Sequence, residues 1–271
     1  MVLPKTIGPR PDIWGGQVML EPVPCDLSVK VCLTTGVSGD IGEIAVAPFT
    51  ALYNTICATD VDHNFGGLAT YQQFDLLITR GLIGSPDWIV EDTPDVLFNN
   101  EVMFRISNIS AGRYFKQLGC QSDINMLALN PLINAGAQSA VVNNQQESSI
   151  NHKSQTRYRN SALVAHYNAT KTPVIISTQT IESTILLCKI RINSTGPTIN
   201  DTLLWKTVDM LFTDFEDKKN DQTRLGTSEA APLYLMSHPS SVEIADVFPA
   251  STRFSDITAQ TIRADGENVL R

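Results

Sequence analysis

The sequence predicts an all-β fold, a single antiparallel β-sandwich, on the strength of three observations. Short segments alternate between apolar and polar residues with the period of two that a half-buried strand shows. Few segments have the spacing of an amphipathic helix, and polar stretches rich in turn-forming residues separate the strands. The chain has 271 residues, of which 42% are hydrophobic, so it is long enough to bury one sizeable core.

Alternation is clearest in Asp26–Thr34 and Thr184–Asn193, which place apolar side chains at every second position. Five further segments are expected to be strands: Gln72–Arg80, Glu101–Ile109, Ser161–Tyr167, Pro173–Ile181 and Trp205–Phe215. Two shorter candidates, Trp88–Val90 and Val96–Phe98, flank Pro94. These segments would form the two sheets of the sandwich.

Helices are expected to be few and short. Pro48–Ile56 spaces its apolar residues at i, i+3, i+4 and i+7, with Pro48 at the first helical position. A second helix is expected over Ala111–Leu118, and a third is possible over Val242–Val247. The Asn-, Gln- and Ser-rich stretch Gln138–Asn160 is interpreted as a surface loop or a mobile segment.

The predicted core spans residues 25–215, between two extended arms. Residues 1–24 form an N-terminal arm, because Pro4, Pro9 and Pro11 oppose regular structure there. Residues 216–271 lack sustained periodicity and are interpreted as a C-terminal arm. Its aromatic residues lie too far apart to form a cluster of their own, so they are candidate anchors on another subunit: Tyr234, Phe248 and Phe254.

The charge distribution argues against tight binding to nucleic acid. The net charge is -8, and affinity for phosphate backbones comes largely from Lys and Arg. The one basic concentration contains Lys153, Arg157, Arg159 and Lys171, with Tyr158 and Tyr167 beside it. Lys153, Arg157 and Arg159 are the candidates for at most weak contact with nucleic acid. No apolar stretch reaches membrane-spanning length, so no membrane insertion is expected.

No catalytic, cofactor or metal site is predicted, and the chain is interpreted as not being an enzyme. Gly36-Val-Ser38-Gly39-Asp40 is taken as a glycine-rich turn after a strand, because no histidine precedes the serine in the order that a chymotrypsin-like triad requires. Asp60-Val-Asp62-His63 has ligand-type side chains but no spaced partner residues, so a polar loop is favoured over a metal site. Neither of two phosphate-binding glycine motifs is present, GxGxxG or GxxxxGK[ST].

The order of strands and helices over about residues 20–215 resembles the eight-stranded jelly roll of icosahedral virus capsid proteins. The composition is similar too, since Asn, Gln, Ser and Thr total 74 residues against 48 charged ones. Picorna-like viruses are the nearer comparison, because there is no Arg/Lys-rich arm. The resemblance implies a structural capsid subunit of a virion assembled in the host cytoplasm, with other capsid subunits as partners and at most weak contact with viral RNA.

Two other classes of function remain open at this point. A β-sandwich binding module, lectin-like or adhesin-like, would also fit the strand pattern. Such a secreted module is expected to have a signal peptide and paired cysteines, whereas this chain begins without an apolar leader and has five cysteines. An enzyme with an unrecognised site is the third hypothesis.

Overall fold

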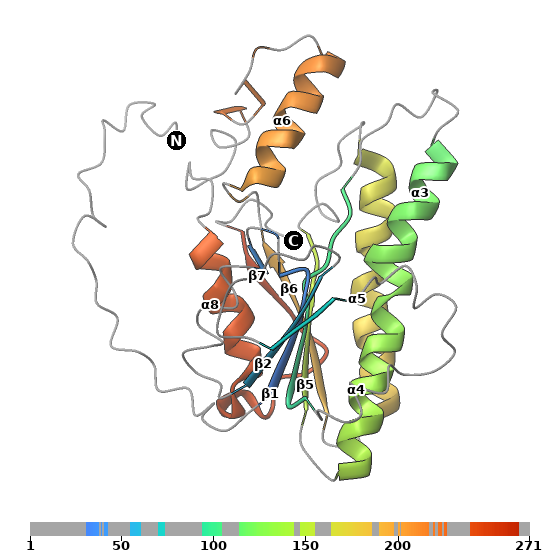
Figure 1. The fold of residues 1–271 in the computed structure, drawn as a ribbon, viewed down its shortest axis with the longest axis vertical. Helices are drawn as coiled ribbons and strands as arrows, with labels where there is room; N and C mark the ends of the chain where they lie inside the picture. Colours follow the sequence, from blue (N-terminus) through green and yellow to red (C-terminus); the bar gives the residue numbers. More distant parts are fainter. Residues whose placement is uncertain are drawn as a thin grey trace, which may run out of the picture.

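A seven-stranded, fully parallel β-sheet forms the centre of the computed structural model (Figure 1). Its strands are β1 (Val31–Thr35), β2 (Thr55–Asp60), β3 (Thr70–Gln73), β4 (Val96–Asn99), β5 (Ser148–His152), β6 (Arg191–Pro197) and β7 (Thr261–Ala264). Their order across the sheet is β3-β2-β1-β4-β5-β6-β7. The expected antiparallel sandwich is therefore wrong, and the fold is of the α/β type.

The structure describes the following residues: 31–37, 39, 41–42, 55–60, 70–73, 94–104, 114–143, 147–154, 164–185, 190–197, 200, 202–216, 219, 222–223, 225–226 and 239–265. All structural statements below refer to this part of the chain.

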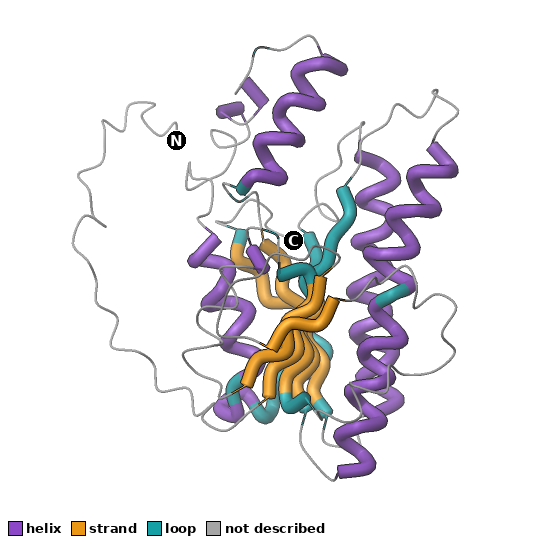
Figure 2. Tube along the Cα trace, in the orientation of Figure 1, coloured by secondary structure: helices purple, strands orange, loops and turns teal. Residues whose placement is uncertain are grey.

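Helices cover both faces of the sheet (Figure 2). They are α3 (Tyr114–Ser122), a π-helical turn η3 (Asp123–Leu127), α4 (Leu129–Asn143), α5 (Ala165–Ile185), α6 (Leu203–Glu216), α8 (Pro239–Ala250) and a short 3-10 helix η7 (Thr252–Phe254). Helices α4 and α5 lie on one face and α8 lies on the other, and α6 lies beyond the edge where the strands end (Figure 1).

The main core lies between the sheet and the α4–α5 layer. Leu33, Leu97 and Ile192 point from three strands into this layer, where they meet Leu132 of α4 and Val174 of α5. The opposite side chains of the same strands are buried as well, so that β4 has four buried residues in a row. A parallel sheet covered on both faces needs apolar residues on both sides of each strand. The strands of such a sheet are therefore not expected to show the strict alternation of apolar and polar residues that a half-exposed strand shows.

Two predicted strands in the second half of the chain overlap helix α5. Pro173–Ile181 lies wholly within α5, where Val174 and Thr178 are one helical turn apart and buried on the same face. The last three residues of Ser161–Tyr167 are also in α5, whereas residues 161–163 lie outside the described part of the chain. Gln138–Asn160 is not one surface loop either, since it begins in α4 and contains the fully buried strand β5.

The predicted strand Trp205–Phe215 is helix α6, and three exposures show why. A strand would place Val208, Met210 and Phe212 on one face. In the structure Val208 and Phe212 are buried one helical turn apart, whereas Met210 is 65% exposed between them. The apolar residues at every second position in this segment therefore belong to a helical pattern, in which only those one turn apart are buried.

Several other expectations agree with the structure in part. Strands at 26–34 and 96–98 contain most of β1 and β4, and helices at 111–118 and 242–247 overlap α3 and α8. The strand at 72–80 begins within β3, and only the last three residues of the strand at 184–193 lie in β6. Residues 101–104 are not a strand, the helix at 48–56 ends inside β2, and the segment at 88–90 lies outside the described residues.

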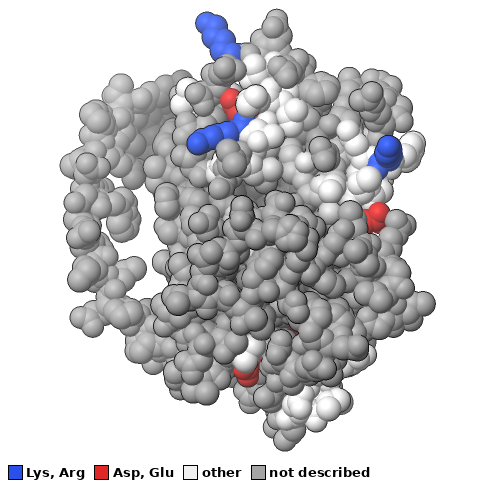
Figure 3. Space-filling model, viewed as in Figure 1, with Lys and Arg blue, Asp and Glu red and all other residues white. Residues whose placement is uncertain are grey.

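The segment after residue 216 contributes α8, which packs on β5, β6 and β7, and β7 itself, which pairs with β6. The division of the chain at residues 24 and 215 stays a prediction. Among the described residues, no helix is both long and apolar enough to cross a membrane. Charged side chains are scattered over the described part of the face drawn in Figure 3 and form no basic patch there.

Candidate active site

The sheet has a topological switch point between its neighbouring strands β1 and β4. From β1 the chain continues outward to β2 and β3, and from β4 it continues in the opposite direction to β5, β6 and β7. The loops that leave β1 and β4 therefore diverge and open a crevice at the carboxyl ends of the strands. In open parallel sheets ligands bind in that crevice, so it is the first place to search for a site.

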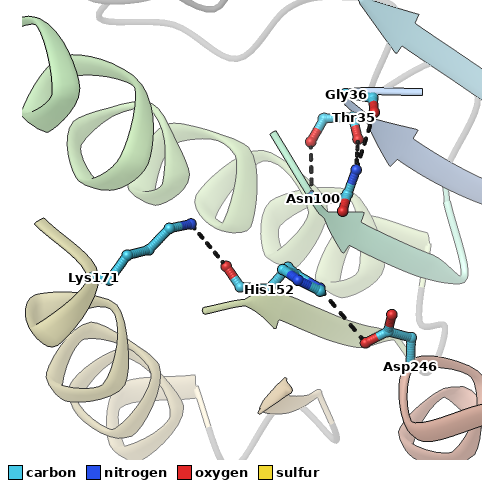
Figure 4. Close-up of polar contacts among 6 residues, drawn as sticks. All are labelled: Thr35, Gly36, Asn100, His152, Lys171 and Asp246. Atoms are coloured by element: carbon cyan, nitrogen blue, oxygen red, sulfur yellow. Dashed lines mark hydrogen bonds and ion pairs between the residues drawn. The ribbon is translucent and has the colours of Figure 1, made fainter. Parts of the chain in front are cut away.

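Polar contacts between the ends of β1 and β4 hold the floor of the crevice together (Figure 4). The Thr35 hydroxyl accepts hydrogen bonds from the backbone N–H groups of Asn100, at 3.1 Å, and Glu101, at 3.2 Å. The Asn100 amide donates in return to the carbonyl oxygens of Thr35, at 3.3 Å, and Gly36, at 3.0 Å. The two strand ends are thereby fixed in one geometry.

The turn after β1 is shaped by glycines at positions 36, 39 and 42. Gly36 has φ of 67°, and a Cβ there would lie 2.9 Å from the Glu101 Cα. A Cβ on Gly42, which is helical, would overlap the Gly36 carbonyl oxygen. Gly39 is exposed, with only the Gly36 carbonyl near its missing side chain. A turn of this kind lets a ligand approach the backbone closely at the start of a helix.

Tyr167 lies in the first turn of α5 and its phenol is buried. Its ring packs edge-on against Phe104, with ring centroids 4.8 Å apart, in a cluster with Val208 and Phe212 of α6. Burial raises the pKa of Tyr167 to about 12, and a hydrogen bond with the Ser154 side chain acts in the opposite direction. Ser154 follows β5 at the carboxyl edge, so a hydroxyl and a phenol meet where the strands end.

Lys171 follows Tyr167 by four residues on α5, which places both side chains on one face of the helix. Lys171 is 1% exposed, and its ammonium donates a hydrogen bond of 3.1 Å to the main-chain carbonyl of His152 (Figure 4). Burial lowers the pKa of Lys171 to about 8, and the Glu101 carboxylate acts to raise it. A lysine that titrates near neutral pH can exchange protons with its neighbours.

A cavity of about 20 Å³, room for about one water, connects Lys171 with the crevice. Its polar lining comes from several elements: Thr35, Asn99, Glu101, Asn125, His152 and Lys171. The strand ends, η3 and α5 therefore contribute to one polar site.

Asn125 is held in this site by the π-helical turn η3. The turn is closed by the i→i+5 bond from the Ala128 N–H to the Asp123 carbonyl, at 3.0 Å. The Asn125 amide accepts from the Met103 N–H at 2.8 Å and donates to the Met103 carbonyl at 2.9 Å and the Thr170 hydroxyl at 3.0 Å. Asn125 thus ties the loop after β4 to α5, and π-helical turns occur often at functional sites.

The site residues predicted from the sequence lie elsewhere or outside the described part. Lys153 is 1% exposed at the end of β5, with its side chain beside Gly196. Phe248 and Phe254 are in ring contact with each other, whereas Arg157, Arg159 and Tyr234 lie outside the described residues. Their proposed contacts with other subunits or nucleic acid stay predictions.

Sequence reasoning noticed Tyr167 and Lys171 but missed their chemistry, and it missed Ser154 and Asn125 altogether. It placed Tyr167 at the end of a strand, which removed the helical relation that brings the phenol and the lysine together. The four-residue spacing of Tyr167 and Lys171 was the available signal. The glycine-rich turn was correctly expected after a strand, but it was not connected with a ligand.

Comparison with curated proteins gives two relatives that are named as dehydrogenases. No family model matches the chain. Galactitol 2-dehydrogenase from Agrobacterium fabrum is 28% identical over 252 residues, covering 89% of this chain and 98% of that protein. Sorbitol dehydrogenase from Cereibacter sphaeroides is 27% identical over 179 residues, covering 64% of this chain and 68% of that protein.

Solved structures agree on the fold. A short-chain dehydrogenase/reductase family protein aligns with a TM-score of 0.71 at 21% identity, over 89% of this chain and 97% of its own. Aldohexose dehydrogenase from Thermoplasma acidophilum aligns with a TM-score of 0.78 at 20% identity, over 91% of this chain and 96% of its own. L-sorbose reductase from Gluconobacter frateurii, solved with NADPH and L-sorbose, aligns with a TM-score of 0.77 at 19% identity, over 91% of this chain and 99% of its own. The chain has the Rossmann-like fold of the short-chain dehydrogenases/reductases.

These findings overturn the capsid interpretation. The relatives are dehydrogenases of cellular organisms, so the virion assignment, the host-cytoplasm assembly and the capsid partners are wrong. The lectin-like alternative is wrong for the same reason. The expectation that the chain is not an enzyme is also wrong, because its homologues are named for enzymatic activities.

Proposed function

We propose that this chain is a short-chain dehydrogenase/reductase that interconverts a secondary alcohol and a carbonyl on a polyol or sugar, with a nicotinamide dinucleotide as the hydride carrier. The observation that carries the proposal is the Ser154–Tyr167 hydrogen bond with Lys171 on the same helix face. The substrate class follows the relatives, which are named for galactitol and sorbitol.

The glycine turn after β1 fits the cofactor. Gly36 and Gly42 leave no space for side chains, while exposed Gly39 leaves the backbone open to a diphosphate at the start of a helix. Asp60 ends β2, the strand beside β1, and an acidic residue at that place in a dinucleotide-binding sheet favours NAD over NADP. A dinucleotide bound there would accept a hydride from the alcohol carbon or return it to the carbonyl carbon.

Tyr167 is the proton-transfer group in this proposal. During oxidation the alcohol O–H bond breaks and its proton passes to the deprotonated Tyr167 oxygen, as the hydride leaves the same carbinol group. During reduction the phenol O–H donates that proton to the carbonyl oxygen. Ser154 is placed to hold the substrate oxygen against Tyr167, because its hydroxyl already bonds the phenol.

Lys171 and Glu101 set the protonation balance of the site. Burial opposes the phenolate of Tyr167 and the Ser154 hydroxyl favours it. A positive charge on Lys171, one helical turn away, would favour the phenolate as well. The Glu101 carboxylate in turn favours the ammonium form of Lys171. Phe104, Val208 and Phe212 keep water away from the phenol and so strengthen these interactions.

The decisive experiment replaces the phenol with a phenyl group. Tyr167→Phe is expected to lower kcat by about 10²- to 10⁴-fold, the usual contribution of general acid–base catalysis. The assay follows reduced nicotinamide absorbance with NAD and NADP, using galactitol, sorbitol and L-sorbose as substrates. Cofactor affinity, measured by calorimetry, is expected to stay unchanged because the glycine turn is intact. A variant that keeps full activity excludes the proposed role of Tyr167.

A further inference from the structure

A buried histidine–aspartate pair lies behind Lys171, on the other face of the sheet. His152 is the last residue of β5, and its Nδ1 atom is 3.8 Å from the Asp246 Oδ1 atom of α8 (Figure 4). The two side chains are 6% and 0% exposed. Neither Asp246 oxygen has a hydrogen-bond partner among the described residues, so the imidazole is the polar group that faces this carboxylate.

His152 connects this pair to Lys171 through its main chain. Its carbonyl oxygen accepts the 3.1 Å hydrogen bond from the Lys171 ammonium, and α5 lies on the face opposite to α8. The next N–H group, that of Lys153, donates to the Thr195 carbonyl of β6 at 2.9 Å. The peptide group that receives Lys171 is therefore held by a neighbouring strand. The His152 imidazole faces the Asp246 carboxylate of α8 at 3.8 Å, without a hydrogen bond between them.

The ring of His152 has a second contact that limits its rotation. It meets Phe98 of β4 edge-on, with centroids 6.1 Å apart and an interplanar angle of 82°. Rotation about the side-chain bonds would break this contact and the approach to Asp246 together. An isolated buried carboxylate is costly, and packing alone would be better served by an apolar pair. A role in positioning accounts for keeping both polar groups here.

We propose that Asp246 and His152 are positioning residues that fix the main-chain carbonyl on which the Lys171 ammonium rests. The expected effect on catalysis rests on the proposed function. The structural connection from α8 through β5 to Lys171 does not depend on that function. Loss of the pair lets the end of β5 shift, which moves the lysine relative to Tyr167. Displacements on the order of 1 Å in such a group can cost about 10²-fold in rate.

The test uses three variants of the full chain. Asp246→Asn keeps the shape and replaces the carboxyl group with an amide, and His152→Gln keeps a polar side chain but removes the imidazole. Glu147→Gln is the matched control, because Glu147 is a buried acid immediately before β5. It lies at the amino end of that strand, whereas Lys171 contacts the carboxyl end. Circular dichroism checks that each variant is folded.

Asp246→Asn and His152→Gln are each expected to lower kcat about tenfold, with substrate KM and cofactor affinity within about twofold of the parent. The double variant is expected to be no slower than the slower single variant, because the two residues act as one unit. Glu147→Gln is expected to retain kcat. Equal kcat in all variants, or additive losses in the double variant, overturns the proposal.

A second readout does not depend on enzymatic activity. Heteronuclear NMR of lysine side chains, with the Lys171 signal assigned through Lys171→Arg, reports the environment of the ammonium. The signal is expected to shift in Asp246→Asn and His152→Gln but not in Glu147→Gln. If the wild-type chain shows no dehydrogenase activity while the shifts appear, the proposed function fails and the positioning inference stands. If the Lys171 signal is the same in all variants, the inference fails even in an active enzyme.

Discussion

At the scale of single residues, burial and neighbouring charge act against each other on the groups that carry the proposed chemistry. Burial opposes the charged form of Tyr167 and of Lys171, while the Ser154 hydroxyl and the Glu101 carboxylate each favour it. The protonation of Tyr167 and of Lys171 therefore depends on a balance between burial and one neighbouring group. Substitution of that neighbour is expected to change the pKa in a direction that follows from its charge or hydrogen bond.

Glu101 gives the first such case. Removing its charge by Glu101→Gln takes away the interaction that raises the pKa of Lys171, so this pKa falls below its present value of about 8. In the proposed reduction Tyr167 gains negative charge as it donates its proton, and the Lys171 ammonium stabilises that charge. The value of kcat/KM for reduction is therefore expected to fall by up to tenfold per pH unit above the pKa of Lys171. A pH–rate profile measures the shift of this limb toward lower pH. Glu101→Asp keeps the charge and is expected to shift it less, and an unshifted limb in Glu101→Gln contradicts the assignment.

Glu147 is a buried acid that affects folding rather than catalysis. Burial, with help from the Asp95 carboxylate, raises its pKa from 4.5 to about 8. Between these values the folded chain holds a proton that the unfolded chain has released. This contribution to the free energy of unfolding is therefore complete below about pH 4.5 and is lost as the pH rises through 8, by at most about 1.4 kcal/mol per pH unit.

Glu147→Gln is expected to remove that dependence, because the amide stays neutral throughout. Urea unfolding between pH 5 and pH 8 is expected to show a shallower decline for the variant than for the parent chain, and higher stability for the variant at pH 8. Parallel curves for the two chains would contradict the raised pKa.

At the scale of elements, the π-helical turn η3 decides where α5 lies relative to the strands. Asn125 satisfies both main-chain groups of Met103 and also reaches Thr170, whose hydroxyl donates to the Tyr167 carbonyl at 2.8 Å. One side chain therefore connects the loop after β4 with the first turns of the helix that bears the proposed catalytic groups.

Asn125→Ala is expected to lower the free energy of unfolding by about 1–3 kcal/mol, because it leaves a part-buried main-chain N–H and carbonyl without partners. Urea unfolding measures the change. Asn143→Ala is the control, since Asn143 is exposed at the end of α4 and, among the described residues, its amide bonds to Ser139 of the same helix. The control is expected to lose less than about 0.5 kcal/mol. Equal losses in the two variants would exclude a special role for Asn125.

The elements also show what the sequence could and could not reveal. Strands β1 and β4 and helices α3 and α8 were found because their local patterns agree with their structure. Parts of α5 and α6 were predicted as strands because their buried residues are four positions apart, a spacing that both periods allow. The pairs are Val174 and Thr178 in α5, and Val208 and Phe212 in α6. Parallel pairing and the meeting of Ser154 with Tyr167 depend on contacts between distant segments, which no local period encodes.

At the scale of the whole molecule, the segment from α8 onward covers one face of the sheet. Arg191, at the start of β6, donates to the carbonyl oxygens of Pro249 and Ser251 at 2.7 and 3.3 Å, and the Ser148 hydroxyl donates to Pro249 at 2.9 Å. These donors satisfy the carboxyl end of α8, as basic residues commonly do. Val242 and Ala250 are fully buried on the same helix.

Truncation after Lys219 tests whether this segment belongs to the folding unit or is a separable arm. The shortened chain lacks α8 and β7, so His152 of β5, which faces α8, would meet water, and β6 would lose its outer partner. Each fully buried apolar side chain that becomes exposed costs about 1.5–3 kcal/mol, so the loss of even a few exceeds the usual margin of stability. We expect the truncated chain to show no cooperative thermal transition by circular dichroism, whereas the full chain melts in one step. A cooperative melt of the truncated chain would instead place a domain boundary near residue 215 and would make α8 and β7 an appendage to a smaller folded unit.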